Sequence, residues 1–356
     1  MRIHLGHHFY GAGNLGDDFM LGGFIRAIRQ LAPHAVLTAS VPFDPVPLRR
    51  RFTEIQWEPY TPEVRVRAVH DSDAWLGLGG SPFQSSQSRW FIDHLLEDAR
   101  LCAEFGKPMY YLGVGVQTTA ELASDDARRL ISQAGAIWTR DPRSAEHIAA
   151  AGPVAPVRVA ADLAHLLFRE TPPPPVTRGR FVVVPNFDYG SWPGMGAFLE
   201  TVHRWPASER IWLAQETRPL PSAERSLYAS LSPARAAEWR LVVPDGASDA
   251  EPCRTVGDSL PSVLQRWPSG EWLVTSRYHA AIAAGWAGAN VVVIDTNEKL
   301  RAAAALLGAP TLAPDADAAS VQAALKHSAP ARPPIAEAEK AFSACREFVS
   351  AIEKRR

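Results

Sequence analysis

A glycine-rich turn between a strand pattern and a helix pattern constrains the fold most strongly. From Gly11 to Asp18 the chain reads Gly-Ala-Gly-Asn-Leu-Gly-Asp-Asp. The run 3–9 before it is apolar and predicts a buried strand, and 19–31 after it carries apolar residues at helical spacing. Such a turn lets backbone amides approach an anion at the positive end of a helix dipole. The alternative is a tight turn that only caps the helix.

The turn matches neither of the two familiar nucleotide-binding patterns. It has no Gly-Lys-Ser/Thr ending, so it is not a P-loop, and it lacks the later glycine and ribose-binding acid of a dinucleotide site. Asp17 and Asp18 could cap the helix, bind sugar hydroxyls or accept a proton. The turn therefore predicts a βα unit and leaves its ligand open.

Strand and helix patterns alternate along both halves of the chain. The predicted strands are 3–9, 35–41, 74–78, 109–116, 136–139, 157–160, 181–184, 211–214, 241–243, 272–275 and 291–294. The predicted helices are 19–31, 89–105, 122–133, 144–151, 197–204, 223–231, 259–267, 280–287, 300–307 and 335–354. This alternation is typical of α/β proteins with parallel sheets covered by helices on both faces.

A run of prolines divides the pattern. The chain has 356 residues, which favours two domains, and 172–175 are four consecutive prolines, which are extended and semi-rigid. We expect a Rossmann-like domain over 1–170, a linker over 171–180, a second Rossmann-like domain over 181–330 and a C-terminal helix over 331–356. Folds of this type bind ligands at the carboxyl ends of the strands, so we expect an interdomain cleft there.

Composition excludes several classes of function. The formal net charge is −1, which gives no basic face for nucleic acid, so we expect no nucleic acid partner. Cys102, Cys253 and Cys345 form no CxxC pair and predict thiols in a reducing compartment. The chain shows no signal-peptide pattern and no apolar run of ~18–20 residues, so we expect a cytoplasmic protein. The basic end 353–356 could touch acidic lipid at the inner face of the membrane; the alternative is a solvated helix end.

Polar residues gather where the predicted strands end. The segments concerned are 77–82, 113–117, 139–144, 161–162 and 275–279. In the last of these, Arg277 offers a planar fork for a carboxylate or phosphate, and His279 can exchange a proton near neutral pH. Residues two apart on an extended turn project to the same side, so both could meet one ligand. Alternatively, Arg277 forms a surface ion pair and His279 caps a helix. Arg140 could likewise pair with its neighbours.

No metal site or serine hydrolase pattern is evident. Asp71 and Asp73 form an Asp-x-Asp motif, but it precedes its strand instead of following it. His7 and His8 alternate across a strand, so they cannot both face one metal. The sequence at Ser81 does not form a Gly-x-Ser-x-Gly elbow. We therefore expect no metal.

Taken in order, the strand-end motifs resemble the polysaccharide pyruvyl transferases. The resemblance spans about 3–308 and rests on Gly-Ala-Gly-Asn-Leu-Gly-Asp (11–17), Gly-Leu-Gly-Gly (77–80), Gly-Val-Gly (113–115), Arg-Asp-x-x-Ser (140–144), Ala-Asp (161–162), Ser-Arg-Tyr-His-Ala (276–280) and Lys299. It implies a fold similar to GT-B glycosyltransferases. It also implies transfer of the pyruvyl unit of phosphoenolpyruvate to two sugar hydroxyls as a cyclic ketal, in cell-surface or exopolysaccharide synthesis.

The resemblance also implies roles for individual residues. Asp17, Arg277 and His279 become the expected catalytic residues, with Asp17 acting on the acceptor and His279 on the donor. The expected substrate-binding residues are Gly13, Asn14, Gly16, Gly79, Gly80, Arg140, Ser144, Ser276 and Lys299. The partners implied are phosphoenolpyruvate and a saccharide that a lipid could carry, with the first domain on the acceptor side and the second on the donor side. No cofactor is implied.

Departures from the family pattern leave the acceptor open. Ser81 stands where a third glycine is common, Asp18 where glutamate is frequent, and 181–186 lacks an expected basic residue. Two alternatives remain. One is a GT-B glycosyltransferase that uses a sugar nucleotide, and the other is a catalytically degenerate binding component of a polysaccharide assembly system. The oligomeric state also remains open.

Overall fold

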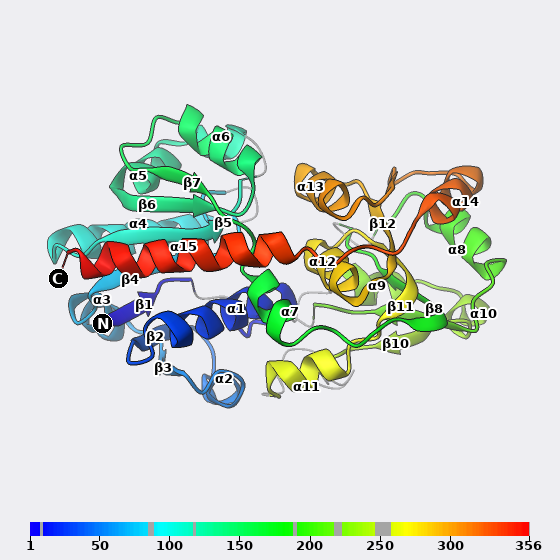
Figure 1. Ribbon diagram of the computed structural model, residues 1–356, viewed down its shortest axis with the longest axis horizontal. Helices are drawn as coiled ribbons and strands as arrows, with labels where there is room; N and C mark the ends of the chain where they lie inside the picture. The colour runs from blue at the N-terminus through cyan, green and yellow to red at the C-terminus, as the bar shows by residue number, and fades with distance from the viewer. Residues whose placement is uncertain are drawn as a thin grey trace. The chain divides into compact units, whose positions relative to one another are not determined.

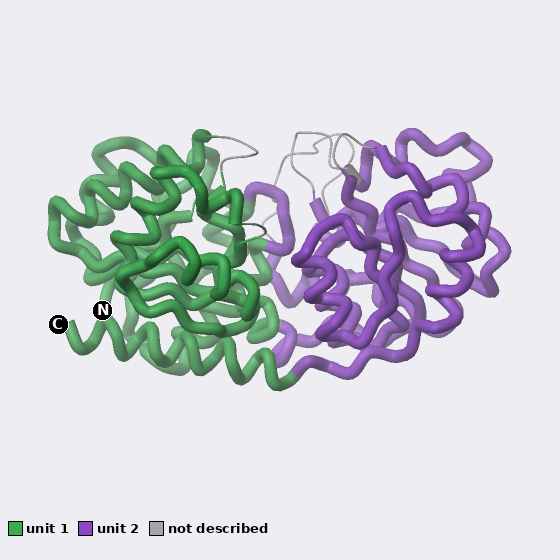
Figure 2. Tube along the Cα trace, turned by 90° about the horizontal axis from the view of Figure 1, so that it is seen from above, with its two compact units in different colours: residues 1–11, 17–167, 335–356 green, residues 12–16, 168–334 purple. Residues whose placement is uncertain are grey.

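The computed structural model describes residues 1–7, 10–84, 89–116, 119–187, 191–216, 223–245 and 258–355. The chain forms two compact units (Figure 2). Unit 1 comprises 1–11, 17–167 and 335–356, and unit 2 comprises 12–16 and 168–334. Residues 8–9, at the end of the predicted strand 3–9, lie outside the described ranges, and so do Gln117 and Cys253. Cys102 and Cys345 are buried free thiols.

Unit 1 is built on a parallel sheet. Over the described ranges it has seven strands in the order β3-β2-β1-β4-β5-β6-β7. Their bounds are β1 Arg2–Leu5, β2 Val36–Val41, β3 Ile55–Pro59, β4 Ala74–Leu78, β5 Met109–Val114, β6 Ala134–Thr139 and β7 Val157–Val159. The strand order reverses between β1 and β4, which creates a topological switch point, the usual place for ligands in this type of fold.

Helices cover both faces of this sheet (Figure 1). They are α1 Leu15–Leu31, α2 Val46–Arg51, α3 Pro62–His70, α4 Arg89–Glu104, η1 Thr119–Leu122, α5 Asp125–Gln133, α6 Pro142–Ala150 and α15 Ile335–Glu353. On one face, α3 to α6 pack against Trp75 and Tyr111. On the other, Phe348 of α15 contacts Phe24 of α1 and Tyr110 of β5. Adjacent residues Tyr110 and Tyr111 thus enter opposite layers, as the pleat of a strand requires.

Unit 2 repeats the architecture. Among its described residues, six parallel strands run in the order β10-β9-β8-β11-β12-β13. They are β8 Thr177–Val184, β9 Glu209–Leu213, β10 Arg240–Val242, β11 Gly270–Thr275, β12 Asn290–Ile294 and β13 Thr311–Leu312. The helices are α8 Met195–His203, α9 Ala223–Ala229, α10 Pro233–Ala236, α11 Leu260–Gln265, α12 Tyr278–Ala287, α13 Glu298–Leu307 and α14 Ala318–His327; the chain enters the unit through α7 Ala164–Glu170. Here the order reverses between β8 and β11.

The predicted fold class, two Rossmann-like parallel sheets with alternating helices, is confirmed. Several bounds differ. Helix α1 begins at Leu15, four residues before the predicted start, and β8 begins at Thr177, within the predicted linker. The C-terminal helix is part of unit 1, because its apolar face, with Cys345 and Phe348, is buried there. None of the described helices has the length and apolar character that a membrane span requires.

Candidate functional site

The turn after β1 is shaped by left-handed glycines. Gly11 and Gly13 have φ values of 70° and 98°, a region that glycine enters without steric cost. Helix α1 starts immediately after Asn14, and the Asn14 Oδ1 atom accepts a hydrogen bond from the Gly16 amide at 3.1 Å. Asn14 therefore caps the helix. The Gly16 amide serves this cap.

Two adjacent carboxylates in α1 have different environments. Asp18 is fully buried; it accepts from the Gly11 amide at 2.6 Å and pairs with Arg51 at 2.6 Å. Burial raises the pKa of Asp18, although Arg51 and the Gly11 amide offset part of the rise. Asp17 is only half-buried. Burial also raises the pKa of Tyr10, and the charges of Asp17 and Asp18 raise it further. Asp18 is thus an anchor for the turn, and Asp17 is the more accessible carboxylate.

His279 lies directly against Gly16. It is the second residue of α12 and only 6% exposed. A Cβ atom placed on Gly16 would lie 2.1 Å from His279 Nδ1, far inside van der Waals contact. The imidazole therefore occupies the space that any other residue at position 16 would fill. The preceding residue, Tyr278, carries Lys299 Nζ over its ring at 5.6 Å from the centroid, a cation–π contact.

Arg277 is held by two carboxylates. Its Nε donates to Glu224 Oε1 at 2.6 Å, and its Nη2 donates to Glu224 Oε2 at 3.1 Å and to Glu216. The Glu224 side chain is completely buried, and that of Arg277 is 12% exposed. Burial raises the pKa of Glu224 more than the Arg277 charge lowers it, and the Glu216 charge adds to the rise. Burial alone would lower the pKa of Arg277, but the two glutamates raise it.

This pairing changes the expected role of Arg277. The sequence predicts that the Arg277 guanidinium binds a carboxylate or phosphate of the donor, but in the structure it donates to Glu216 and Glu224. Two carboxylates contact this one guanidinium, so its donors and its charge are already engaged within the protein. Arg277 is also the residue that immediately precedes α12. Its fixed guanidinium thus holds the chain two residues before His279.

Ser276 joins two strand ends at the switch point of unit 2. Its Oγ accepts from the Asn186 amide at 2.5 Å and donates to the Asn186 carbonyl at 3.0 Å. Its amide donates to the Val184 carbonyl at 3.2 Å. The Ser276 hydroxyl, expected to bind substrate, is thus engaged by the backbone beyond β8. It fixes the segment that carries His279.

In unit 1, two consecutive glycines follow β4. Gly79 and Gly80 have φ values of 67° and 69°. A Cβ on Gly79 would lie 2.6 Å from Met20 Sδ, whereas a Cβ on Gly80 would meet no atom within 4 Å. The Gly80 carbonyl accepts from the Gly115 amide at 2.8 Å, which links the ends of β4 and β5. Gly79 is therefore required for packing, and Gly80 borders open space.

The end of β6 completes this edge. The Arg140 guanidinium covers Gly115, where a Cβ would lie 2.3 Å from its Nη2, and Arg140 Nε lies 3.8 Å from Asp141 Oδ2. Ser144 is fully buried; its Oγ accepts from the Val116 amide at 2.9 Å and donates to Asp141 Oδ2 at 2.8 Å. The hydroxyl expected to bind substrate therefore ties α6 to the loop after β5, a structural role.

The predicted site residues therefore fall into two groups. Unit 2 contains Gly13, Asn14, Gly16, Ser276, Arg277, His279 and Lys299, and unit 1 contains Asp17, Gly79, Gly80, Arg140 and Ser144. Sequence reasoning missed Glu216 and Glu224. Glu216 follows the predicted strand 211–214, so the polar strand-end rule could have found it. Glu224 lies in a helix and gives no comparable signal.

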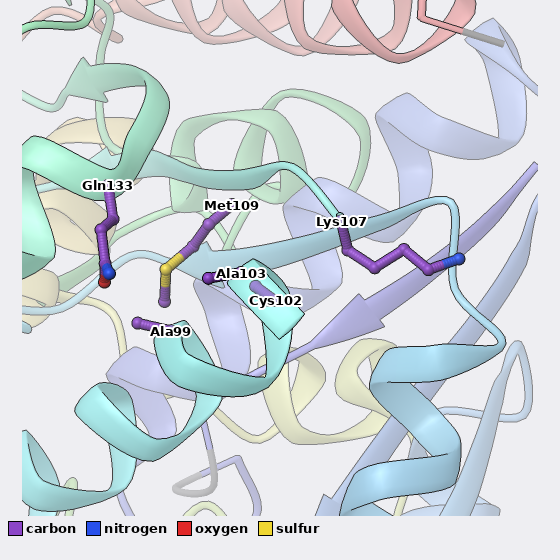
Figure 3. A pocket seen from close by; sticks show the side chains of 6 residues that line it. All are labelled: Ala99, Cys102, Ala103, Lys107, Met109 and Gln133. Carbon is purple, nitrogen blue, oxygen red and sulfur yellow. The ribbon is translucent and has the colours of Figure 1, made fainter. Parts of the chain in front are cut away.

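Two further features bear on ligands. Within the described ranges, no three His, Cys, Asp or Glu side chains gather as a metal site. A cavity of about 110 Å³ is lined by Ala99, Cys102, Ala103, Lys107, Met109 and Gln133 (Figure 3). Met109 is the first residue of β5, so this cavity lies at the amino edge of the sheet, opposite the strand ends described above. In Figure 3 the Lys107 side chain points away from the other labelled residues.

Comparison with known families agrees with this arrangement of motifs. A model of the polysaccharide pyruvyl transferase family matches residues 14–218, more than half of the chain. The chain therefore belongs to the polysaccharide pyruvyl transferase family, which confirms the resemblance seen in the motifs. The matched range includes Asp17, Gly80 and Arg140 and ends before His279. A comparison with curated proteins found no match.

Solved structures share the fold over the whole chain. UDP-GlcNAc 2-epimerase from Methanocaldococcus jannaschii is 10% identical with a TM-score of 0.61, over 98% of this chain and 99% of that chain. The Neisseria meningitidis epimerase bound to UDP-GlcNAc is 10% identical with a TM-score of 0.62, over 99% and 100%. Anabaena Alr3699/HepE in complex with UDP-glucose is 10% identical with a TM-score of 0.58, over 100% and 98%. At this identity the likeness establishes the fold, which is GT-B-like.

Proposed function

We propose that this protein transfers the pyruvyl group of phosphoenolpyruvate to two hydroxyls of a saccharide, forming a cyclic pyruvate ketal in polysaccharide biosynthesis. The observation that carries the proposal is the placement of His279. In a chain of this family, its imidazole is pressed against Gly16 and its backbone is fixed at the switch point of unit 2. A buried imidazole on a rigid strand end is suited to proton transfer at a defined position.

The reaction needs two proton-transfer roles. A proton added to the methylene carbon of phosphoenolpyruvate makes the adjacent carbon electrophilic, and a sugar hydroxyl attacks it while losing its own proton. The C–O bond to phosphate then breaks, inorganic phosphate leaves, and a second hydroxyl adds and loses its proton. One phosphoenolpyruvate and one diol thus give one ketal and one phosphate. We assign protonation of the methylene carbon to His279 and deprotonation of the acceptor to Asp17.

The donor carries a carboxylate and a phosphate, so its site needs cations. Arg277 is matched by Glu216 and Glu224, and we therefore assign it a positioning role. We assign donor binding to Lys299, which is held beside Tyr278. Arg140 is assigned to substrate binding, because its guanidinium can donate two parallel hydrogen bonds to one anion. Gly80, whose Cα faces open space, is assigned to the acceptor.

The direct test is incubation with phosphoenolpyruvate and a panel of glycans. We expect phosphate release together with a mass gain of one ketal-linked pyruvyl group on the glycan. Replacement of His279 by Ala should abolish both, whereas His327→Ala, at an exposed histidine near the end of α14, should leave both unchanged. Transfer by the His279→Ala variant at the wild-type rate would overturn the assignment of His279.

A second candidate is a glycosyltransferase that uses a sugar nucleotide. It is favoured by the structural neighbours, since two of them are complexes with UDP-glucose and UDP-GlcNAc. The same incubation with UDP-glucose in place of phosphoenolpyruvate separates the two functions. Release of UDP with a hexose added to the glycan, and no reaction with phosphoenolpyruvate, would favour the second candidate.

A further inference from the structure

We propose that Trp90 of unit 1 is a stacking subsite for one sugar ring of the saccharide acceptor. The inference rests on the proposed function for the identity of that acceptor. Trp90 is the second residue of α4, and the chain reaches it from Gly79 and Gly80 at the carboxyl end of β4. Its neighbour Phe91 contacts the ring of His7, just beyond β1, at 5.3 Å between centroids. The start of α4, which carries Trp90, therefore lies close to the end of β1.

Among the tryptophan, tyrosine and phenylalanine residues in the described part of the chain, Trp90 is the most exposed, with 43% of its surface exposed. Exposing so much of an indole forgoes hydrophobic stabilisation, since burial of apolar surface contributes about 25 cal/mol per Å². Single exposed apolar residues are common, so exposure alone indicates nothing. The environment of the indole is what distinguishes it.

The indole is held in place by other rings. The ring centroids of Trp90 and His94 are 4.5 Å apart with an interplanar angle of 68°, an edge-to-face arrangement. His94 in turn packs against Tyr60 at 5.0 Å, and the Tyr60 hydroxyl lies 3.2 Å from His94 Nδ1. The Trp90 ring thus rests on a chain of contacts that runs from α4 to the loop before α3. These two helices lie side by side (Figure 1).

A buried ion pair between Arg65 and Asp98 supports the rings of Tyr60 and His94. Arg65 of α3 lies over the Tyr60 ring at 5.5 Å, donates to the His94 carbonyl and pairs with Asp98 at 2.6 Å. Asp98 also accepts from Trp75 Nε1 at 3.1 Å. Burying an ion pair carries a large desolvation cost, and such a pair is weak evidence for stability. Its effect here is geometric: it sets the positions of Tyr60 and His94, and through them the indole.

Charged residues flank Trp90 in the sequence of α4. Arg89, the preceding residue, contacts Asp93 at 3.3 Å and Asp126 at 2.8 Å, and all three are exposed or half-exposed. A sugar ring presents an apolar C–H face and an edge of hydroxyls, so it matches one aromatic face with donors and acceptors beside it. A stable protein partner needs about 800 Å² of buried surface on each side, far more than one indole supplies. The chemistry therefore favours a saccharide.

The test uses saturation-transfer NMR with methyl β-D-galactopyranoside and methyl β-D-glucopyranoside as probes. We expect the full-length wild-type protein to saturate the C–H protons on one face of at least one glycoside. The Trp90→Ala variant should lose this signal, and Trp90→Phe should keep part of it. Val66→Ala, at an exposed apolar residue of α3, is the matched control and should behave as wild type. In turnover with an accepted glycan, Trp90→Ala should raise the KM for the glycan about threefold to tenfold and leave that for phosphoenolpyruvate unchanged.

The outcomes separate the subsite from the proposed function. Loss of glycoside binding in Trp90→Ala, with no phosphate release by wild type, supports the subsite and contradicts the function. Transfer by wild type, together with an unchanged KM for the glycan in Trp90→Ala, supports the function and contradicts the subsite. The subsite is also overturned if neither glycoside receives saturation from wild type, or if Trp90 instead mediates self-association in sedimentation experiments.

Discussion

Replacement of Gly16 by Ala gives the sharpest test of the site. The new methyl carbon would lie 2.1 Å from His279 Nδ1, and an ordinary contact begins at 3.4 Å, so the imidazole has to retreat by about 1.3 Å. Displacement of a reacting group by about 1 Å can cost about 100-fold in rate. We therefore expect pyruvyl transfer to fall about 100-fold.

Stability should change much less than activity. Alanine is favoured over glycine inside a helix by about 1 kcal/mol, and Gly16 lies in the first turn of α1. Overpacking in a buried region costs about 1–3 kcal/mol. The two effects oppose each other, so the free energy of unfolding in urea should change by no more than about 2 kcal/mol. A large loss of rate with little loss of stability distinguishes a displaced imidazole from a misfolded chain.

Gly196 provides a matched control. It is the second residue of α8, as Gly16 is of α1, and a Cβ there meets no atom within 4 Å. Gly196→Ala should retain wild-type transfer, measured as phosphate release from phosphoenolpyruvate with an accepted glycan. NMR of the imidazole resonances, assigned with His279→Ala, should show the His279 signals shifted in Gly16→Ala alone. Wild-type rates and unshifted resonances in Gly16→Ala would refute the reasoning.

Three further substitutions test the buried charges. Arg51→Ala leaves Asp18 buried without its ion-pair partner and should cost about 3–5 kcal/mol of unfolding free energy in urea. The pKa of Glu224 is raised in the folded chain, so the folded state binds a proton more tightly than the unfolded state does. As the pH falls from neutral through that raised pKa, the free energy of unfolding of wild type should therefore increase relative to that of Glu224→Gln. Urea unfolding of both proteins across this pH range measures the difference. Arg277→Lys should lower kcat about tenfold or more while leaving the KM for phosphoenolpyruvate within about threefold, because a positioning group and not a ligand contact is lost; steady-state kinetics separates the two.

The sequence predicts the central strands well because burial on both faces leaves continuous apolar runs. The predicted strand 74–78 coincides with β4. The edge strand β3 was missed, since Gln56 and Glu58 interrupt its apolar residues. Helix α3 was missed because its arginines dilute the apolar stripe. An element can be predicted from periodicity only where its apolar and polar residues form a clear pattern, and β3 and α3 lack one.

The sequence predicts where the candidate site residues lie in the fold, but not which side chains they contact. Once the strands are placed, the carboxyl ends follow, and Arg277 and His279 are found there. The partners of Arg277 are not predictable in this way, because Glu216 and Glu224 are 61 and 53 residues away in the chain. The contact between Gly16 and His279 likewise joins opposite ends of the sequence. Such pairings depend on how the elements pack, which periodicity alone does not contain.

The paired state of Arg277 also explains how His279 can be held so firmly on a short segment. Ser276 is hydrogen-bonded to the Asn186 backbone, and the next residue, Arg277, is paired with two buried carboxylates. The backbone is thereby fixed just before α12 begins, and Gly16 limits the ring from the side. A functional group held by its neighbours within about 0.5 Å needs little reorganisation when it reacts. A guanidinium that bound the donor directly would have to remain available to it, and could not also provide this rigid support.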